Sequence, residues 1–378
     1  MRSSFVSNFL VGVFFFCLGP VMFAKETPSE SGGPAGTKAE IKEYIEHHLK
    51  DSHDFSIASY TDDQSNTVHW GFPLPVILWD NGLKVFSSSL FHHGETVAEV
   101  DGNYYKLYHS KIYKTDSEGT IVYDAEDHPT NAKPLDFSIT KNVVMMLVTG
   151  LLMLWLFTSM ARKYQKSGGV PTGVAKFFEP IVLYIRDDIA IPNIGEKKYS
   201  RYMPFLLTVF FFIWFLNMFG LTPLGVNVTG NIAVTTALAL IVFLMTNFTG
   251  TKDYWKHIFD PLGDGMPWYG KMIIYIILVP IEILGIFIKP FALLIRLYAN
   301  MTAGHVVLMS LIGLIFIFKS WVGGPLSFGL SFAISLIEVL VALLQAYIFT
   351  MLSALYFGFA AEEHDHDHDH EEPVLEHL

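Results

Sequence analysis

An apolar run of 47 residues, from Met272 to Phe318, constrains the fold of this chain more than any other feature. Only isolated polar positions and the prolines Pro280 and Pro290 interrupt it. As a single α-helix the run would be about 70 Å long, more than twice the roughly 30 Å thickness of the hydrocarbon core of a bilayer. We therefore expect this segment to be kinked, strongly tilted, or divided into an interfacial piece and a spanning piece.

Further apolar stretches indicate a polytopic membrane protein. Hydrophobic residues make up 51% of the 378-residue chain and charged residues 16%, against roughly 25% in typical globular domains. The pattern predicts an all-α membrane domain over residues 138–359 with about five transmembrane helices. The spans are expected near residues 138–160, 203–225, 231–250, 272–318 and 326–359. Residues 174–195 are too often interrupted by charge to span and predict an interfacial helix.

The N-terminus has the pattern of a secretory signal. Arg2 precedes a short apolar segment that ends at Ala24 and is followed by residues rich in Ser, Gly and Pro. We interpret residues 1–24 as a cleaved signal peptide, with an uncleaved first spanning helix as the alternative. Cys17, the only cysteine of the sequence, lies in this segment, which excludes a disulfide framework and a cysteine-based metal site.

Residues 25–137 form a polar extension before the first expected span. They hold 19 Asp or Glu against 9 Lys or Arg, which argues against a nucleic-acid surface. Residues 38–51 predict a short amphipathic helix. After it, short runs separated by the turn signals Asn81-Gly82 and Asp101-Gly102 predict a small extramembrane domain of mixed or β character. Eight scattered histidines are interpreted as solvated surface in preference to a metal site.

The loop after the first expected span is basic. Its cations are Arg162, Lys163, Lys166 and Lys176. By the positive-inside rule this loop is cytoplasmic, which places residues 25–137 in the periplasm, in agreement with a secretory signal. Five spans then place the acidic, His-rich tail over residues 360–378 in the cytoplasm. We interpret this tail as solvated, with weak binding of Zn²⁺ or Ni²⁺ as the alternative.

Three polar side chains interrupt the 47-residue run at neighbouring positions: Arg296, Asn300 and His305. An arginine cannot shed its proton and is costly in apolar surroundings. At 100° per residue Asn300 shares a face with Arg296, whereas His305 points to the opposite side of the helix. The two faces are therefore expected to meet different environments. Glu282 would lie close to the Arg296 face if Pro290 did not interrupt the helical count.

The last apolar segment carries Glu338 and Gln345, which are seven residues apart and share one face. Burying an isolated carboxylate is costly, so Glu338 is expected to be protonated, paired or facing water. His305 and Glu338 on neighbouring helices would form a proton-conducting pair. In the alternative interpretation, Arg296 only snorkels or pairs with a carboxylate to fix helix packing. The concentration of such groups in two helices favours a proton or ion pathway.

The decapeptide RLYANMTAGH, which starts at Arg296, closely resembles the signature of subunit a of the F-type ATP synthase. The segment NIAVTTALAL, from Asn231, is similar to part of the third span in that family. Glu338 and Gln345 stand where the last helix of the family carries two functional polar residues. The resemblance covers roughly residues 138–359.

This resemblance implies a non-catalytic stator subunit of a rotary proton motor in the bacterial inner membrane, whose last two helices are long and tilted. Arg296 would face the ring of c subunits, supported by Asn300 and Gln345. His305, Glu338 and Glu282 would line the aqueous half-channels for protons. The partners would be the c-subunit ring, the b subunits, the rest of the ATP synthase and the lipid bilayer, with no cofactor, metal or nucleic acid.

Two other classes of function make different demands on the sequence. A self-sufficient secondary transporter using Glu338 and His305 would be expected to show inverted repeats, and the sequence has no clear internal duplication. An intramembrane metallopeptidase would need an H-E-x-x-H motif, which no span contains. The choice between protons and Na⁺ stays open, because Na⁺ selection would lie largely in the c subunit. The resemblance assigns no role to residues 25–137.

Overall fold

The computed structural model describes residues 50–61, 67–126, 128–222, 226–260, 268–317 and 323–362. The expected signal peptide, all but the last two residues of the helix expected over 38–51, and most of the expected tail lie outside these described residues. The chain divides into two compact units. The first contains Met1–Thr172, Val209–Thr235 and Ile295–Tyr347, and the second contains Gly173–Thr208, Thr236–Leu294 and Ile348–Leu378.

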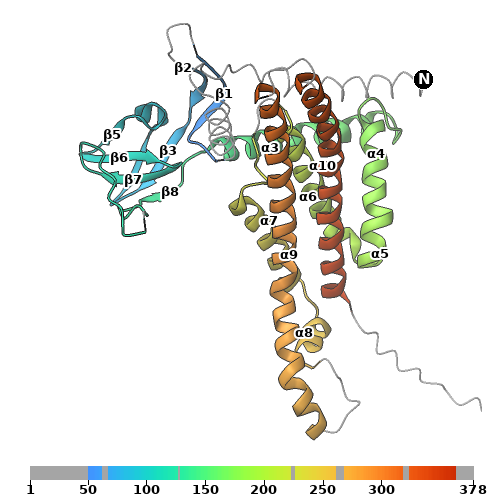
Figure 1. Ribbon diagram of the computed structural model, residues 1–378. Helices are drawn as coiled ribbons and strands as arrows, with labels where there is room; N and C mark the ends of the chain where they lie inside the picture. Colours follow the sequence, from blue (N-terminus) through green and yellow to red (C-terminus); the bar gives the residue numbers. More distant parts are fainter. Residues whose placement is uncertain are drawn as a thin grey trace, which may run out of the picture. The chain divides into compact units, whose positions relative to one another are not determined.

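The extension before the first long helix folds as three antiparallel sheets (Figure 1). Its strands are β1 (Asp54–Thr61), β2 (Thr67–Pro73), β3 (Pro75–Trp79), β4 (Leu83–Ser87), β5 (Val97–Val100), β6 (Asn103–Tyr108), β7 (Lys111–Thr115) and β8 (Leu135–Asp136). Strand β1 pairs with β2, β3 lies between β4 and β8, and β6 lies between β5 and β7. A short 3₁₀ helix, Ser88–Gly94, follows β4. The predicted β character is therefore confirmed.

Both turn signals of the sequence form the ends of hairpins. Asn81-Gly82 lies between β3 and β4, and Asp101-Gly102 lies between β5 and β6. All four residues have positive φ, which Gly, Asn and Asp adopt at the lowest cost. The hairpins bring together the core of the extension, which consists of Val76, Leu78, Phe91, Ala98, Tyr105 and Ile112.

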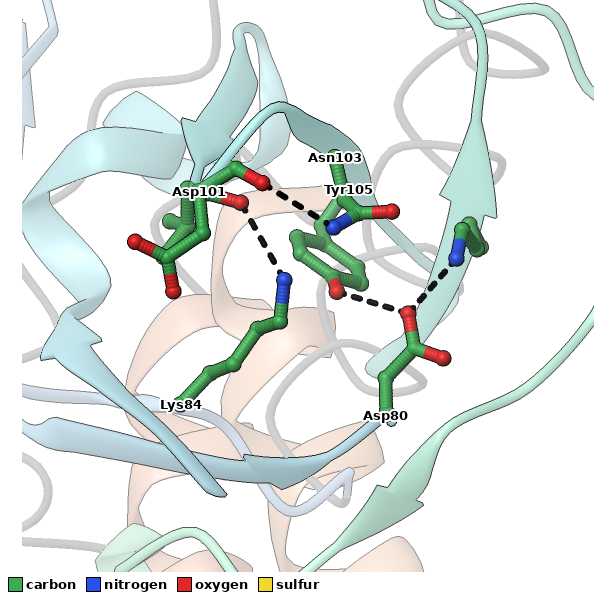
Figure 2. A network of polar contacts seen from close by, with 7 residues as sticks. Asp80, Lys84, Asp101, Asn103 and Tyr105 are labelled. Carbon is green, nitrogen blue, oxygen red and sulfur yellow. Dashed lines mark hydrogen bonds and ion pairs between the residues drawn. The ribbon is translucent and has the colours of Figure 1, made fainter. Parts of the chain in front are cut away.

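A polar network ties the β3–β4 turn to the β5–β6–β7 sheet. The Tyr105 hydroxyl and the Lys114 ammonium group both donate to Oδ2 of Asp80, each at 2.8 Å. Figure 2 shows Tyr105 above Asp80. Nζ of Lys84 on β4 donates to the carbonyl of Val100 on β5. The hydrogen bond from Lys114, followed by that from Tyr105, lowers the pKa of Asp80. Asp80 thus stabilises the extension in its ionised form.

One histidine of the extension departs from the solvated surface that the sequence predicts. His53 is 3% exposed, and its Nε2 lies 3.0 Å from Oδ2 of Asp136. Burial alone would raise the pKa of Asp136, but the hydrogen bonds from His53 and Ser138 outweigh it and lower the pKa. His92 and His128 are exposed, as expected. Within the described ranges, no three His, Cys, Asp or Glu side chains lie close enough together to hold a metal ion.

The extension continues into the first long helix through paired backbone. After β8, the main-chain N–H groups of Phe137 and Ile139 donate to carbonyls of β3, at 2.8 and 3.1 Å. Helix α3 (Lys141–Lys166) begins two residues later, and the N–H of Lys141 donates to the carbonyl of Ser52 at 3.0 Å. An apolar cluster spans the same junction and consists of Phe55, Leu74, Met145, Leu216, Val226 and Val228. The extension is therefore anchored to the first turns of α3.

The remaining helices are α4 (Ala175–Tyr184), a π-helical segment (Ile185–Ala190), α5 (Ile191–Ile194), α6 (Tyr199–Gly220), α7 (Ile232–Phe248), α8 (Lys252–Phe259), α9 (Trp268–Ile317) and α10 (Gly323–Ala361). Among the described residues, the helices α3, α6, α9 and α10 are long and apolar enough to cross a membrane. Helices α7 and α8, bent by 98°, add a fifth span if the pair counts as one. The prediction of a polytopic membrane protein with about five spans is confirmed. Residues 175–194 are helical, and the interfacial position predicted for 174–195 stays a prediction.

The 47-residue apolar run, apart from Phe318, which lies outside the described residues, is part of one continuous helix. Helix α9 has 50 residues and contains both Pro280 and Pro290. A proline removes one main-chain donor, but membrane helices tolerate it because neighbouring groups satisfy the freed carbonyl. Of the three arrangements expected for this run, division into two pieces is therefore wrong. At 1.5 Å per residue α9 is about 75 Å long, still more than twice the bilayer core.

In the second unit, donors from other segments close the C-terminal end of α10. The N–H of Thr251 donates to the carbonyl of Ala360 at 2.9 Å, and Nζ of Lys198 donates to that of Ala361 at 2.6 Å. The last carbonyls of a helix lack internal partners and carry partial negative charge, so an amide and an ammonium group stabilise them. These bonds stabilise the C-terminal end of α10.

Candidate functional site

Arg296 and Asn300 lie one turn apart on α9, within the first unit, and both are exposed. Nδ2 of Asn300 donates to Oε1 of Gln345 on α10 at 2.9 Å. In the part of the chain that the structure describes, Arg296 has no hydrogen-bond or ion-pair partner. The described residues therefore give no support to the alternative in which Arg296 pairs with a carboxylate of its own chain.

His305 lies on the other side of α9 and is 3% exposed. This contrast with Arg296 agrees with the helical count, which predicted two different environments. The His305 ring faces Gly220 at the end of α6, where a Cβ atom would lie 3.0 Å from Nε2 of the ring. Nε2 is buried and has no hydrogen-bond partner among the described residues. A buried ring nitrogen of this kind needs a polar partner, and water can serve.

Glu338 on α10 is also buried and lies over Gly304, the residue before His305. A Cβ atom on Gly304 would clash with the Glu338 carboxyl group, so a larger residue there would have to displace that group. Oε2 of Glu338, like Nε2 of His305, lacks a hydrogen-bond partner within the described residues. The structure therefore brings Glu338 beside the turn that carries His305, but no direct hydrogen bond joins the two side chains.

The first unit contains a second set of buried polar side chains, Asn217 and Thr229, which the sequence did not predict. Thr229 Oγ1 donates to Oδ1 of Asn217 on α6 at 2.6 Å, and Nδ2 of Asn217 donates to the carbonyl of Ala342 at 3.4 Å. Both polar side chains are 1% exposed. Ala342 follows Glu338 by one helical turn, so this pair lies against the same stretch of α10. The only signal in the sequence was a lone asparagine in an apolar span, which is weak by itself.

Glu282 belongs to the second unit, where it is half-buried on α9. The first unit therefore brings together five of the six expected residues, in two groups. In the first group, exposed Asn300 is bonded to buried Gln345, and exposed Arg296 lies one turn before Asn300 on the same helix. His305 and Glu338 lie buried on the other side, next to the α6–α10 contacts.

These features define a multi-pass membrane protein with polar groups suited to ion translocation inside two long apolar helices. Residues 143–358, more than half of the chain, match the family model described as ATP synthase A chain. The chain belongs to this family, ATP synthase subunit a, and is the proton-translocating, non-catalytic stator subunit of that complex.

Curated relatives agree with this assignment. The chain is 44% identical over 238 residues to ATP synthase subunit a of Chloroherpeton thalassium, covering 61% of this chain and 69% of the relative. The same subunit of Myxococcus xanthus is 46% identical over 230 residues, 59% of this chain and 73% of the relative. ATP synthase subunit a 2 of Prosthecochloris aestuarii is 40% identical over 302 residues, 76% of this chain and 90% of the relative. Residues 44–137 match a separate domain of unknown function (DUF8433).

Proposed function

We propose that Arg296 is the fixed charge of the stator and faces a ring of c subunits that carry carboxyl groups in the membrane. The supporting observation is its exposed guanidinium group, which has no partner among the described residues. A lone charge in a membrane-spanning helix is costly. A carboxylate on a neighbouring subunit would compensate this charge.

The chemistry follows from the properties of the guanidinium group. It stays protonated at any physiological pH, so it attracts the c-subunit carboxyl group as the anion and favours release of its proton. The same fixed positive charge blocks direct proton leakage between the two access paths. Each proton that crosses the membrane makes available about 2.3 kcal/mol per 100 mV. The bond from Asn300 to Gln345 would hold α9 and α10 in register on this side.

We assign proton access on one side of the membrane to His305 and Glu338. Their buried, unpartnered polar atoms support this assignment, because water in a narrow access path would satisfy them. The bonded pair of Asn217 and Thr229 would line the same path. Glu282, which belongs to the second unit, is also assigned to the lining of an aqueous access path.

We further propose that the protein lies in the bacterial inner membrane after cleavage of residues 1–24, with the extension in the periplasm and the tail over 360–378 in the cytoplasm. The basic loop after α3 supports this orientation by the positive-inside rule. The membrane domain over 138–359 would then bind the c-subunit ring and the b subunits.

Substitution of Arg296 tests the central proposal. Arg296→Ala is expected to abolish ATP-driven proton pumping into inverted membrane vesicles, because no fixed cation would drive proton release from the ring. Mild-detergent purification of the variant should still recover the c-subunit ring and the ATPase head. Asn300→Ala, which removes only the bond to Gln345, is the matched control and should retain part of the pumping. Full pumping by Arg296→Ala would contradict the proposal, and failure of the unaltered chain to co-purify with a c ring would favour a separate transporter.

A further inference from the structure

The outer face of the sheet formed by β4, β3 and β8 is apolar. Trp79 pairs directly with Leu83 on β4 and with Leu135 on β8, which puts these three side chains in one row on one face. Ile77, two residues before Trp79, pairs with Val85 and begins the second row. Phe137, whose N–H donates to the carbonyl of Ile77, extends that row beyond β8.

This face is not part of the core of the extension. The alternate residues Val76 and Leu78 are fully buried on the other face of β3. On the outer face, the exposed fractions are 55% for Trp79, 62% for Leu83, 60% for Val85, 63% for Leu135 and 63% for Phe137. The water-facing side of an antiparallel sheet is normally polar, and a contiguous exposed apolar patch marks a binding surface.

Charged residues of the same strands point away from the apolar face. Lys84 and Asp136 both pair with Leu78, so their side chains lie on the core side of the sheet. There Lys84 donates to the carbonyl of Val100, and Asp136 pairs with His53. The sheet therefore presents one face from which these charges are excluded, as an element that contacts hydrocarbon would require.

The position of the face in the chain indicates what covers it. Phe137 precedes α3 by four residues, so at no more than about 3.5 Å per residue it lies within about 14 Å of the start of that spanning helix. The residues between are bonded to β3 and to Ser52, which limits their freedom. The first half of α3 is itself apolar and exposed, at Leu147 and Leu151. The apolar face is thus continuous along the chain with the lipid-facing surface of a transmembrane helix.

We propose that this outer face, formed by Trp79, Leu83, Val85, Leu135 and Phe137, rests on the lipid leaflet at the point where α3 enters the membrane. Trp79 lies where an indole ring is favoured, at the boundary between hydrocarbon and water. The face acts as a second membrane contact of the subunit, next to the spanning helices. This inference depends on the membrane-spanning character of the chain and not on the roles proposed for Arg296, His305 or Glu338.

Site-specific photocrosslinking of the full-length chain in native membranes tests the proposal. The photoreactive residue p-benzoylphenylalanine replaces Leu83 in one variant and Val85 in a second, in case one position disturbs folding. Leu151, which is exposed on α3, is the lipid-facing control, and Glu99, which is exposed on β5, is the water-facing control. After illumination, intact-mass spectrometry of the purified subunit distinguishes phospholipid adducts from protein conjugates.

We expect the yield of phospholipid adducts at positions 83 and 85 to be within about twofold of that at position 151 and at least about tenfold above that at position 99. A conjugate with another protein, or with a second copy of this chain, at both positions would overturn the proposal in favour of a protein partner. Adduct yields at both positions equal to that at position 99 would overturn it in favour of a face exposed to water.

Discussion

Gly304 offers the sharpest test of the geometry around Glu338. In Gly304→Ala the new Cβ atom would lie 2.6 Å from Cδ and Oε1 of Glu338 and closer still to Oε2. Ordinary contact begins at 3.4 Å, so Cδ and Oε1 must each move by about 0.8 Å and Oε2 must move further. Alanine is favoured over glycine in a helix by about 1 kcal/mol, so the helical backbone of α9 should keep its conformation in this variant.

A displacement of this size is expected to slow proton transfer while the subunit still assembles. Misplacing a reacting group by about 1 Å can lower a rate by about a hundredfold. We therefore expect ATP-driven proton pumping in inverted vesicles to fall by about tenfold to a hundredfold, with the amount of assembled complex unchanged. Gly150→Ala on α3 is the matched control, because a Cβ atom there would meet nothing within 4 Å.

Shortening the acid should relieve the clash. Glu338→Asp withdraws the carboxyl group by about one methylene, and the pumping defects of Gly304→Ala and Glu338→Asp should therefore not add. We expect the double variant to pump faster than the product of the two single effects predicts, by a coupling free energy of about 0.5–3 kcal/mol. Unaltered pumping in Gly304→Ala, or strictly additive effects in the double variant, would refute the placement of Glu338 over Gly304.

The remaining predictions concern other parts of the first unit. Glu338→Gln and His305→Ala should each slow proton flux with milder effects on assembly, and unchanged flux in both would place the access path elsewhere. Because the pKa of Asp80 is lowered in the folded extension, Asp80 stabilises the extension above the pKa of the unfolded chain, and this contribution disappears as the pH falls through the folded pKa. The protection of the β3–β4 turn against hydrogen exchange, relative to an unstructured peptide at the same pH, should therefore fall below about pH 4, whereas in Asp80→Asn it should be low already at neutral pH. Thr229→Val leaves the buried oxygen of Asn217 without its donor and should destabilise the purified complex by about 1–3 kcal/mol in thermal unfolding, whereas Thr229→Ser should not.

Some site residues could be predicted from the sequence, and others depend on contacts between segments that are far apart in the chain. Arg296 was found because a charge in an apolar run is costly wherever the run folds. Asn217 and Gly304 were missed because an asparagine in an apolar span, or a glycine in a helix, has many explanations until its neighbours are known. Their partners, Thr229 and Glu338, are separated from them by 12 and 34 residues, beyond the reach of helical periodicity.

The sequence by itself determined the membrane-spanning class of the protein, the β character of the extension, the two hairpin turns and the opposite environments of Arg296 and His305. These properties depend on apolar length, on the backbone preferences of Asn-Gly and Asp-Gly, and on the helical repeat, all of which are local. Only the tertiary structure decided that α9 is continuous through its prolines and that Glu338 lies over Gly304. It also decided that the face carrying Trp79 is left exposed beside α3. Those outcomes depend on which segments pack together, because burial and polar partners are properties of the assembled fold.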